Sequence, residues 1–131
     1  MTQISFGYPR RGLTGVFNTF RLGLSWIMKC PKGESVELVD SRSKKVLAKA
    51  TVLRVFTGPL NELAPAHARW AHNWKDHPED QRADLLIASM MKRYPPGRVS
   101  QTSVCSVIYL REGTNANQDQ LQPAGGDHPG E

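Results

Sequence analysis

Cysteine is scarce in this chain, since its 131 residues include only Cys30 and Cys105. The two could pair, but without a secretory context free thiols are the favoured interpretation. Long apolar runs are also missing: the most apolar stretch, residues 85–91, is interrupted by Ser89 and is far shorter than the roughly 20 residues of a membrane-spanning helix. The first residues lack the charged and then apolar order of a secretory signal. We therefore expect a cytoplasmic protein that does not enter a membrane.

Motifs for metal binding and for nucleophilic catalysis are absent as well. The chain has no HExxH, no paired cysteine spacing, no glycine-rich phosphate loop and no Gly-x-Ser-x-Gly. His67, His72 and His77 follow in steps of five, which on a helix turns successive side chains by about 140°. We therefore expect no metal, no cofactor and no catalytic residue. His72 and Asp76 are compatible with an acid/base pair, but a solvated helical contact is the favoured interpretation.

Basic residues are missing from the end of the chain. Residues 113–131 contain three acidic residues and no Lys or Arg, and Leu121 is their one large aliphatic residue. Such a segment buries too little apolar surface to offset its ordering entropy, so we expect a disordered acidic polar tail. Residues 1–112 have the length of one domain and hold all 17 Lys and Arg against nine of the twelve acidic residues, a net charge of +8. A basic domain attracts polyanions such as RNA, DNA and nucleotides.

Four runs of β-branched and apolar residues, separated by turn residues, predict strands. The runs are residues 16–22, 35–40, 46–56 and 102–110. In the third run, residues 46–56, apolar residues occupy both the even and the odd positions, which face opposite sides of a strand. This predicts a strand that is covered on both sides or kinked by a bulge.

Two helices are predicted between the third and fourth strands. Pro65 argues against one smooth helix from residue 60, so we expect a short turn and then a helix that starts near Pro65. Trp70 and Trp74 on its face are expected to be buried against the sheet. An acidic start and the Pro-Pro-Gly sequence at 95–97 delimit the second helix. Its apolar face comprises Ala83, Leu86, Ile87, Met90 and Tyr94. Together these elements indicate an α+β fold with a curled antiparallel sheet.

With its elements in this order, the sequence resembles the ASCH superfamily over about residues 16–111. The segments that carry the resemblance are Asn18-Thr19-Phe20-Arg21-Leu22-Gly23, Gly33-Glu34-Ser35-Val36-Glu37-Leu38, Ala48-Lys49-Ala50-Thr51-Val52, Leu60-Asn61-Glu62-Leu63, His67-Ala68 and Tyr94-Pro95-Pro96-Gly97. The resemblance implies a PUA-like curled β-barrel with two flanking helices. It also implies a cleft beside the strand 16–22 that receives a nucleotide, a nucleoside or RNA.

The sequence departs from the family at the positions that would carry catalysis. Some members resemble amidohydrolases of N4-acetylated cytidine, with a Lys three residues before the strand threonine and a Glu after the His-Ala of the first helix. Here those positions are Val16 and, depending on one gap, Ala71 or His72. Valine neither attacks a carbonyl nor moves a proton, so we do not expect this chemistry. For catalysis, Glu62 or His72 would have to replace the missing carboxylate or base of the family enzymes.

We expect the binding site to comprise Arg10, Arg11, Thr19, Arg21, Trp26 and Lys29. Thr19 and Arg21 lie two apart on one strand and so face the same side, where the guanidinium can grip a phosphate or base edge. The other four combine cations with an aromatic ring, which suits single-stranded nucleic acid. Spacing alone favours a surface position for Arg21. For Trp26, a position in the core is at least as favourable as a role in binding. The resemblance to the family favours the cleft.

The leading hypothesis is an ASCH-type module that binds RNA or a nucleotide in a basic cleft. The sequence does not determine the oligomeric state, and a monomer is the favoured interpretation. One alternative is an enzyme in the same cleft, either a nuclease or a divergent N4-acetylcytidine amidohydrolase. Another is a phage or mobile-element protein whose basic face binds a host protein. The groups that surround Thr19 and Arg21 distinguish the first two.

Overall fold

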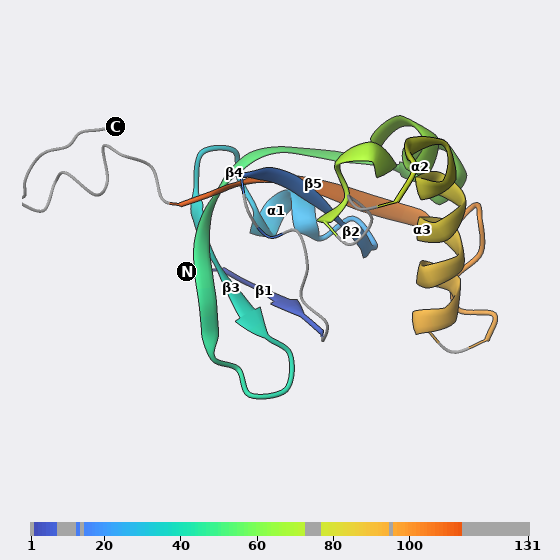
Figure 1. The fold of residues 1–131 in the computed structure, drawn as a ribbon. Helices are drawn as coiled ribbons and strands as arrows, with labels where there is room; N and C mark the ends of the chain where they lie inside the picture. Colours follow the sequence, from blue (N-terminus) through green and yellow to red (C-terminus); the bar gives the residue numbers. More distant parts are fainter. Residues whose placement is uncertain (1, 8–12, 14, 73–76, 95, 114–131) are drawn as a thin grey trace, which may run out of the picture.

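The computed structural model describes residues 2–7, 13, 15–72, 77–94 and 96–113, whose strands form one five-stranded sheet (Figure 1). The strands are β1 (Gln3–Phe6), β2 (Val16–Leu22), β3 (Ser35–Asp40), β4 (Val46–Pro59) and β5 (Val104–Glu112). Their order is β1-β3-β4-β5-β2, with β1 parallel to β3 and the other neighbours antiparallel. The α+β class is confirmed, but the sheet is mixed rather than purely antiparallel.

The predicted strands match the observed ones closely. The bounds of β2 and β3 agree with the predicted runs, whereas β4 continues to Pro59 and β5 spans 104–112 rather than 102–110. The predicted kink is present in β4, whose register with β5 shifts between Val52 and Arg54. Strand β1 is not among the predicted strands, and its four residues pair with a strand more than thirty positions away.

The sheet is strongly curled but does not close through hydrogen bonds. Among the described strands, β1 and β2 are the two edges and are not paired with each other. Side chains bridge the gap instead, because the guanidinium of Arg21 on β2 lies 4.8 Å from the ring centroid of Phe6 on β1. The closed barrel that the resemblance implies is therefore not shown.

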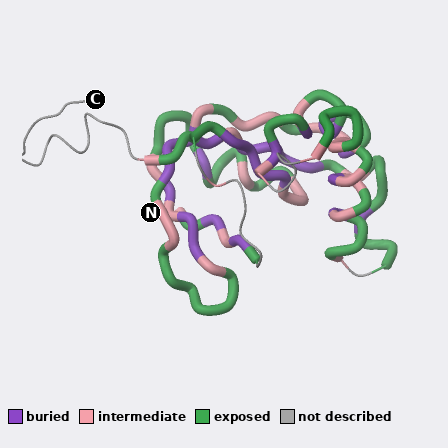
Figure 2. Tube along the Cα trace, viewed as in Figure 1, coloured by how far each residue is buried: buried purple, intermediate pink, exposed green. Residues whose placement is uncertain are grey.

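The two faces of the curled sheet support two separate cores (Figure 2). Alternation along β5 divides its side chains, so that Ile108 and Leu110 face the inside of the curl while Cys105 and Val107 face the helices. The inner core also contains Ile4, Phe6, Phe17, Cys30, Val36, Leu38, Ala50 and Val52. The helical core contains Phe20, Leu60, Leu63, Ala64, Ala68, Ala71, Leu86, Met90 and Val99. Strand β2 contributes to both and so lies at their junction.

Helix α2 (Leu60–His67) follows β4 without a turn, which contradicts the predicted start near Pro65. The amides of Leu60 and Asn61 donate to the carbonyls of Ser103 and Gln101, at 2.8 and 2.7 Å. These tertiary bonds satisfy helix-start donors that would otherwise have no partner. They fix the start at residue 60, and the helix accommodates Pro65 in its interior.

Three further helical segments complete the described fold. These are α1 (Trp26–Lys29), the 3₁₀ turn η1 (Ala68–Trp70) and α3 (Glu79–Arg93). The predicted apolar face of α3 is confirmed, since Leu86 and Met90 are buried in the helical core. The expected burial of Trp70 is wrong, because 44% of this residue is exposed on η1. Trp74, Asp76 and the predicted tail beyond Gly113 lie outside the described residues.

Both cysteines are buried free thiols, one in each core, as the sequence favours. Burial raises the pKa of Cys30 and of Cys105, which keeps both thiols protonated and unreactive. None of the described helices has the length and apolar character needed to cross a membrane. Within the described ranges, no three His, Cys, Asp or Glu side chains cluster as a metal site would require.

Candidate functional site

Strand β2 places Thr19 and Arg21 on the same face, as their spacing predicts. The pairing of β2 with β5 runs without a register shift, so alternation holds over the whole strand. Thr19 is only 2% exposed, and its hydroxyl oxygen accepts a hydrogen bond of 3.1 Å from Nε of Arg21. This bond fixes the orientation of the guanidinium.

Aromatic rings flank the guanidinium of Arg21. Its Cζ atom lies 4.8 Å from the ring centroid of Phe6 and 5.8 Å from that of Trp26. Nζ of Lys29 lies 4.5 Å from the same Trp26 ring. The structure therefore brings together four of the predicted site residues, while Arg10 and Arg11 lie outside the described residues.

A cleft of about 310 Å³, including its open mouth, lies between β2 and α3. Its lining residues are Thr19, Phe20, Ala71, His72, Leu86, Ser89, Met90 and Arg93. Thr19 connects this cleft to the aromatic setting of Arg21, because it lines the one and bonds to the other. Polar groups from β2, from His72 and from α3 thus converge on one small volume.

The cleft and its mouth are electropositive. Burial, reinforced by the nearby charge of Arg93, lowers the pKa of Arg21 to about 10. Arg21 therefore remains charged at neutral pH, although it is partly removed from water. Among the residues that the structure describes, no carboxylate forms an ion pair with Arg21 or lines the cleft. Two arginines that repel each other without a neutralising acid create an electrostatic setting that favours an anion.

His72 forms one wall of the cleft, and its ring meets those of Phe6 and Phe17 edge-on, at 5.0 and 6.4 Å between centroids. The sequence singles out His72 as a substitute base, and the structure places it beside Thr19. Glu62, the other substitute, is exposed on α2 and does not line the cleft. Asp76, the predicted partner of His72, lies outside the described residues.

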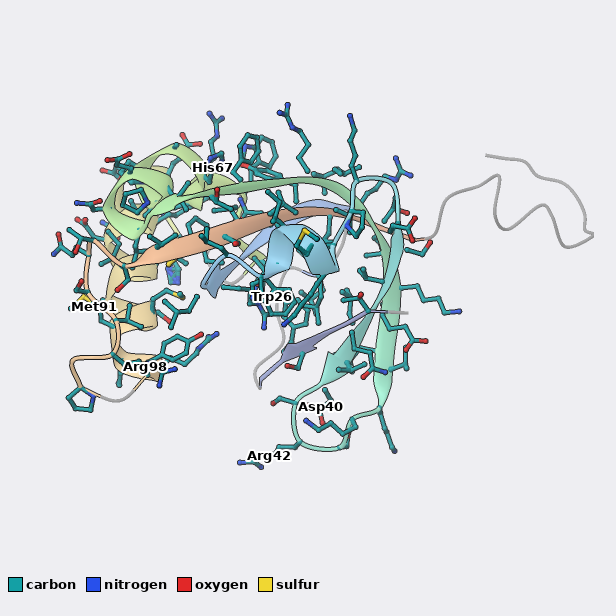
Figure 3. The ribbon with its side chains drawn as sticks, turned by 180° about the vertical axis from the view of Figure 1, so that it is seen from behind. Trp26, Asp40, Arg42, His67, Met91 and Arg98 are labelled. Carbon is teal, nitrogen blue, oxygen red and sulfur yellow. The ribbon has the colours of Figure 1, made fainter. Side chains whose placement is uncertain are left out.

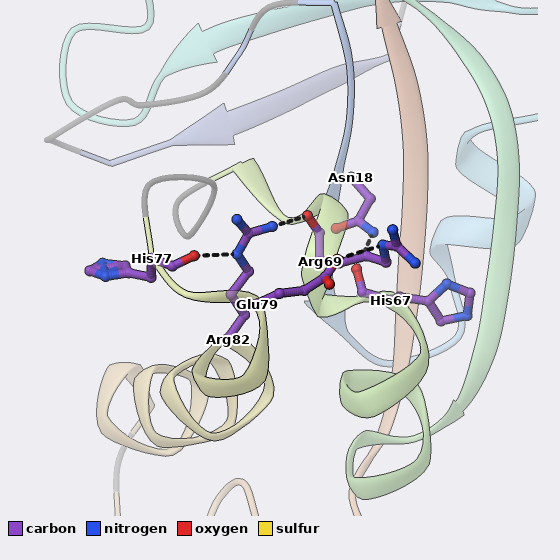
Figure 4. Close-up of polar contacts among 6 residues, drawn as sticks. All are labelled: Asn18, His67, Arg69, His77, Glu79 and Arg82. Atoms are coloured by element: carbon purple, nitrogen blue, oxygen red, sulfur yellow. Dashed lines mark hydrogen bonds and ion pairs between the residues drawn. The ribbon is translucent and has the colours of Figure 1, made fainter.

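A network of hydrogen bonds fixes the segment that carries His72 (Figure 4). Nδ2 of the fully buried Asn18 donates to the carbonyl of His67 at 2.9 Å, and the backbone of Asn18 bridges to Ala71. On the other side, Arg82 of α3 donates to the carbonyls of His77 and Arg69, at 2.8 and 2.6 Å. The network links β2, η1 and α3, so the walls of the cleft are held in fixed relation.

Sequence reasoning missed Arg93 and Phe6. Arg93 ends α3, where a cation is ordinary because it complements the helix dipole. Nothing local distinguishes it from a solvated residue. Phe6 belongs to the short β1, which was not predicted. Both residues reach the site only because the curl of the sheet and the docking of α3 bring distant segments together.

Comparison with known proteins identifies a shared fold. No family model and no curated protein matches the chain. Two solved structures are similar over 92% of it. One is a DUF984 protein from Enterococcus faecalis V583, with 11% identity, a TM-score of 0.52 and 72% of its own chain covered. The other is a point mutant of the protein ZmASCH from Zymomonas mobilis, with 16% identity, a TM-score of 0.48 and 79% covered.

Identities this low establish likeness of fold and carry no function with them. The chain shares its fold with the Enterococcus faecalis protein, and the resemblance to the ASCH superfamily stays a prediction from the sequence. The function has to be argued from the cleft itself.

Proposed function

We propose that the cleft between β2 and α3 binds the phosphate group of a nucleotide, either free or as one unit of an RNA chain. The observation that carries the proposal is that Arg93 lines the Thr19 cleft and Arg21 is bonded to Thr19 at its edge, with no described carboxylate to neutralise them. A partly buried charge without a counterion is unfavourable, and a phosphate that enters the cleft offsets this cost. A neutral ligand would not.

The polar groups of the cleft suit a phosphate in shape as well as in charge. A guanidinium offers several N–H donors in one plane, and its bonds to phosphate are charge-assisted. The hydroxyls of Thr19 and Ser89 and the ring of His72 supply further hydrogen-bonding groups along the wall. The enclosed space of the cleft is only about 20 Å³, so the cleft admits one small group at its mouth, and the sugar and base of a nucleotide lie outside it.

Aromatic side chains at the mouth supply a surface for the base. Trp26 is partly exposed on α1, and Arg21 and Lys29 lie over its ring. Stacking of a base on an aromatic ring tolerates any base, since every base has a π face. The proposal therefore specifies recognition of the phosphate and leaves the base open.

Isothermal titration with UMP, AMP, uridine and adenosine tests the proposal. We expect each nucleotide to bind at least about tenfold more tightly than its nucleoside, because the bonds from arginine to phosphate are charge-assisted. Equal affinities for nucleotide and nucleoside would refute a phosphate site. Inorganic phosphate, which has no base, should bind more weakly than either nucleotide if the rings at the mouth contribute.

An enzyme is the second candidate, and the observation in its favour is that His72 and Thr19 line the same cleft. A neutral imidazole beside a hydroxyl is a common arrangement for general base catalysis. The amidohydrolase version is disfavoured by sequence, because Val16 and Ala71 or His72 stand where the family enzymes have Lys and Glu.

An assay of N4-acetylcytidine deacetylation separates the two candidates. We expect no turnover above background in the wild type, and none in Val16→Lys, because the carboxylate that the family mechanism needs is still missing. Turnover of acetylcytidine or of RNA that disappears in Thr19→Ala and in His72→Ala would establish the enzyme instead.

A further inference from the structure

A second group of cations and rings lies on the outer face of β4 and β5, away from the cleft. In the antiparallel register Arg54 lies opposite Tyr109, and Thr51 lies opposite Arg111. Directly paired residues share a face, and Tyr109 and Arg111 are two apart on β5. The two arginines and the tyrosine ring therefore lie side by side on one surface. Figure 3 shows nitrogen-tipped side chains projecting from the outer side of β4.

The rings of this face form a connected platform. The guanidinium of Arg54 lies 4.9 Å from the ring centroid of Phe56, and Phe56 stacks on His67 at 4.7 Å with 30° between the planes. The ring of His67 is hydrogen-bonded to the Tyr109 hydroxyl at 2.7 Å. Arg54 is thus held over aromatic surface, in a defined position, rather than extended freely into solvent.

Trp70 and Arg69 extend this surface at its rim on η1. Trp70 is 44% exposed, and the guanidinium of Arg69 lies 5.5 Å from its ring. Arg69 also pairs with Glu79 at 2.9 Å, an exposed ion pair of small energetic value. The exposed arginines of the strands have no such partner: among the described residues, no acid forms an ion pair with Arg54 or Arg111.

The segment from Ala68 to His72 separates this outer face from the cleft. Its Ala71 is bridged to Asn18 on β2, and its His72 lines the cleft. Its Arg69 lies on the other side, where its charge lowers the pKa of Tyr109 against the larger raising effect of burial. The two surfaces therefore have no residue in common.

We propose that the outer face of β4 and β5 binds single-stranded nucleic acid. Arg54 and Arg111 contact phosphates, and the exposed ring of Trp70 stacks on a base. Alternating cations and exposed rings match a single strand, whose bases are accessible to stacking. A duplex hides those base faces, and an acidic peptide has none. The inference stands on residues outside the cleft and does not depend on the function proposed for the cleft.

Fluorescence anisotropy with labelled oligo(U) of about 12 nucleotides tests the proposal, since single-strand sites span roughly 4–16 nucleotides per domain. The double variant R54Q/R111Q should weaken binding at least about tenfold and lower the magnitude of the salt slope by about 1.4, because two phosphate contacts are lost. The control R42Q/K45Q removes the same charge from the β3–β4 turn and should change affinity by less than about twofold. If the two double variants weaken binding equally, only net charge matters and the proposal fails.

Further binding measurements identify the class of partner and distinguish the outer face from the cleft. Trp70→Ala should weaken oligo(U) binding by about fivefold or more through lost stacking. An RNA duplex of equal charge, or poly-glutamate, bound as tightly as oligo(U) would contradict a single-strand site. Binding of UMP should be unchanged in R54Q/R111Q and lost in Arg21→Gln. If the wild-type protein does not bind UMP, the function proposed for the cleft is refuted. The oligo(U) measurements would still test the outer face independently.

Discussion

The cleft beside β2 and the turn between β3 and β4 both carry clustered cations, but their surroundings differ. The turn holds Arg42, Lys44 and Lys45, all exposed, and Figure 3 shows Arg42 at its tip, remote from Trp26. The turn is stabilised by Asp40, whose carboxylate accepts bonds from the amide and hydroxyl of Ser43 at 3.0 and 2.7 Å. The backbone amides of Lys44 and Lys45 also donate within the turn, at 2.9 and 3.3 Å, while their charged side chains are exposed.

In the cleft, by contrast, the cations are oriented and partly removed from water. Arg21 is fixed by Thr19 and by two aromatic rings, and the charge of Arg93 acts on it directly. The difference shows that the number of basic residues does not define an anion site. What defines it is the convergence of cations in a partly buried place without a neutralising acid.

The largest expected effect is on nucleotide affinity. R21Q/R93Q should weaken UMP binding by about 100-fold, since hydrogen bonds to charged groups contribute about 1.5–3 kcal/mol each. The matched variant R42Q/K45Q loses the same two charges from the turn and should retain wild-type affinity within about twofold. Titration calorimetry on all three proteins measures this. Similar losses in both variants would remove the distinction between the two regions.

A second prediction separates binding from stability. At neutral pH the charge of Arg21 costs folding about 3 kcal/mol at most, judging from its lowered pKa, and its ring contacts offset about 1–2 kcal/mol. The cost is present below about pH 10 and vanishes only where Arg21 is deprotonated in both the folded and the unfolded state. Arg21→Met should therefore raise the free energy of unfolding by about 1 kcal/mol while removing UMP binding.

Urea denaturation measures that change, with Arg42→Met at the exposed turn as control. The control should leave both the free energy of unfolding and UMP binding unchanged. A clear destabilisation by Arg21→Met would mean that Arg21 is a structural residue and that the site is wrongly assigned.

The smallest predicted effect concerns pH and lies outside both basic regions. Burial lowers the pKa of His67, which stacks on Phe56 and bonds to Tyr109. A base with a lowered folded pKa contributes full stability above its unfolded pKa and loses it as the pH falls toward the folded value. The free energy of unfolding should thus decrease as the pH falls below about 6.5. His67→Gln should reduce this dependence.

The local sequence pattern was sufficient to predict four of the strands and the common face of Thr19 and Arg21. Alternation on a strand is a property of neighbouring residues, so a spacing of two predicts a common face wherever the strand lies. The kink in β4 also follows from local apolar residues of both parities. The common face of Thr19 and Arg21 could therefore be predicted without a structure, whereas their role in binding is a prediction from the family resemblance.

The rest depends on contacts between distant segments. Four residues are too few for β1 to be recognised before its pairing with β3 is known. The start of α2 is fixed by carbonyls some forty positions later, which outweighs the local effect of Pro65. Arg93 joins the cleft only through the packing of α3. Trp70 is exposed because η1 turns it outward, away from the core that a helical pattern predicts.

The most direct test of the central claim observes the side-chain Nε–H resonance of Arg21 by NMR during titration with UMP. The account predicts that this resonance shifts and saturates with UMP, that uridine leaves it nearly unmoved, and that the response is lost in Arg93→Gln. A response to uridine equal to the response to UMP, or an unmoved Arg21 resonance while UMP binds elsewhere, would contradict a phosphate site between β2 and α3.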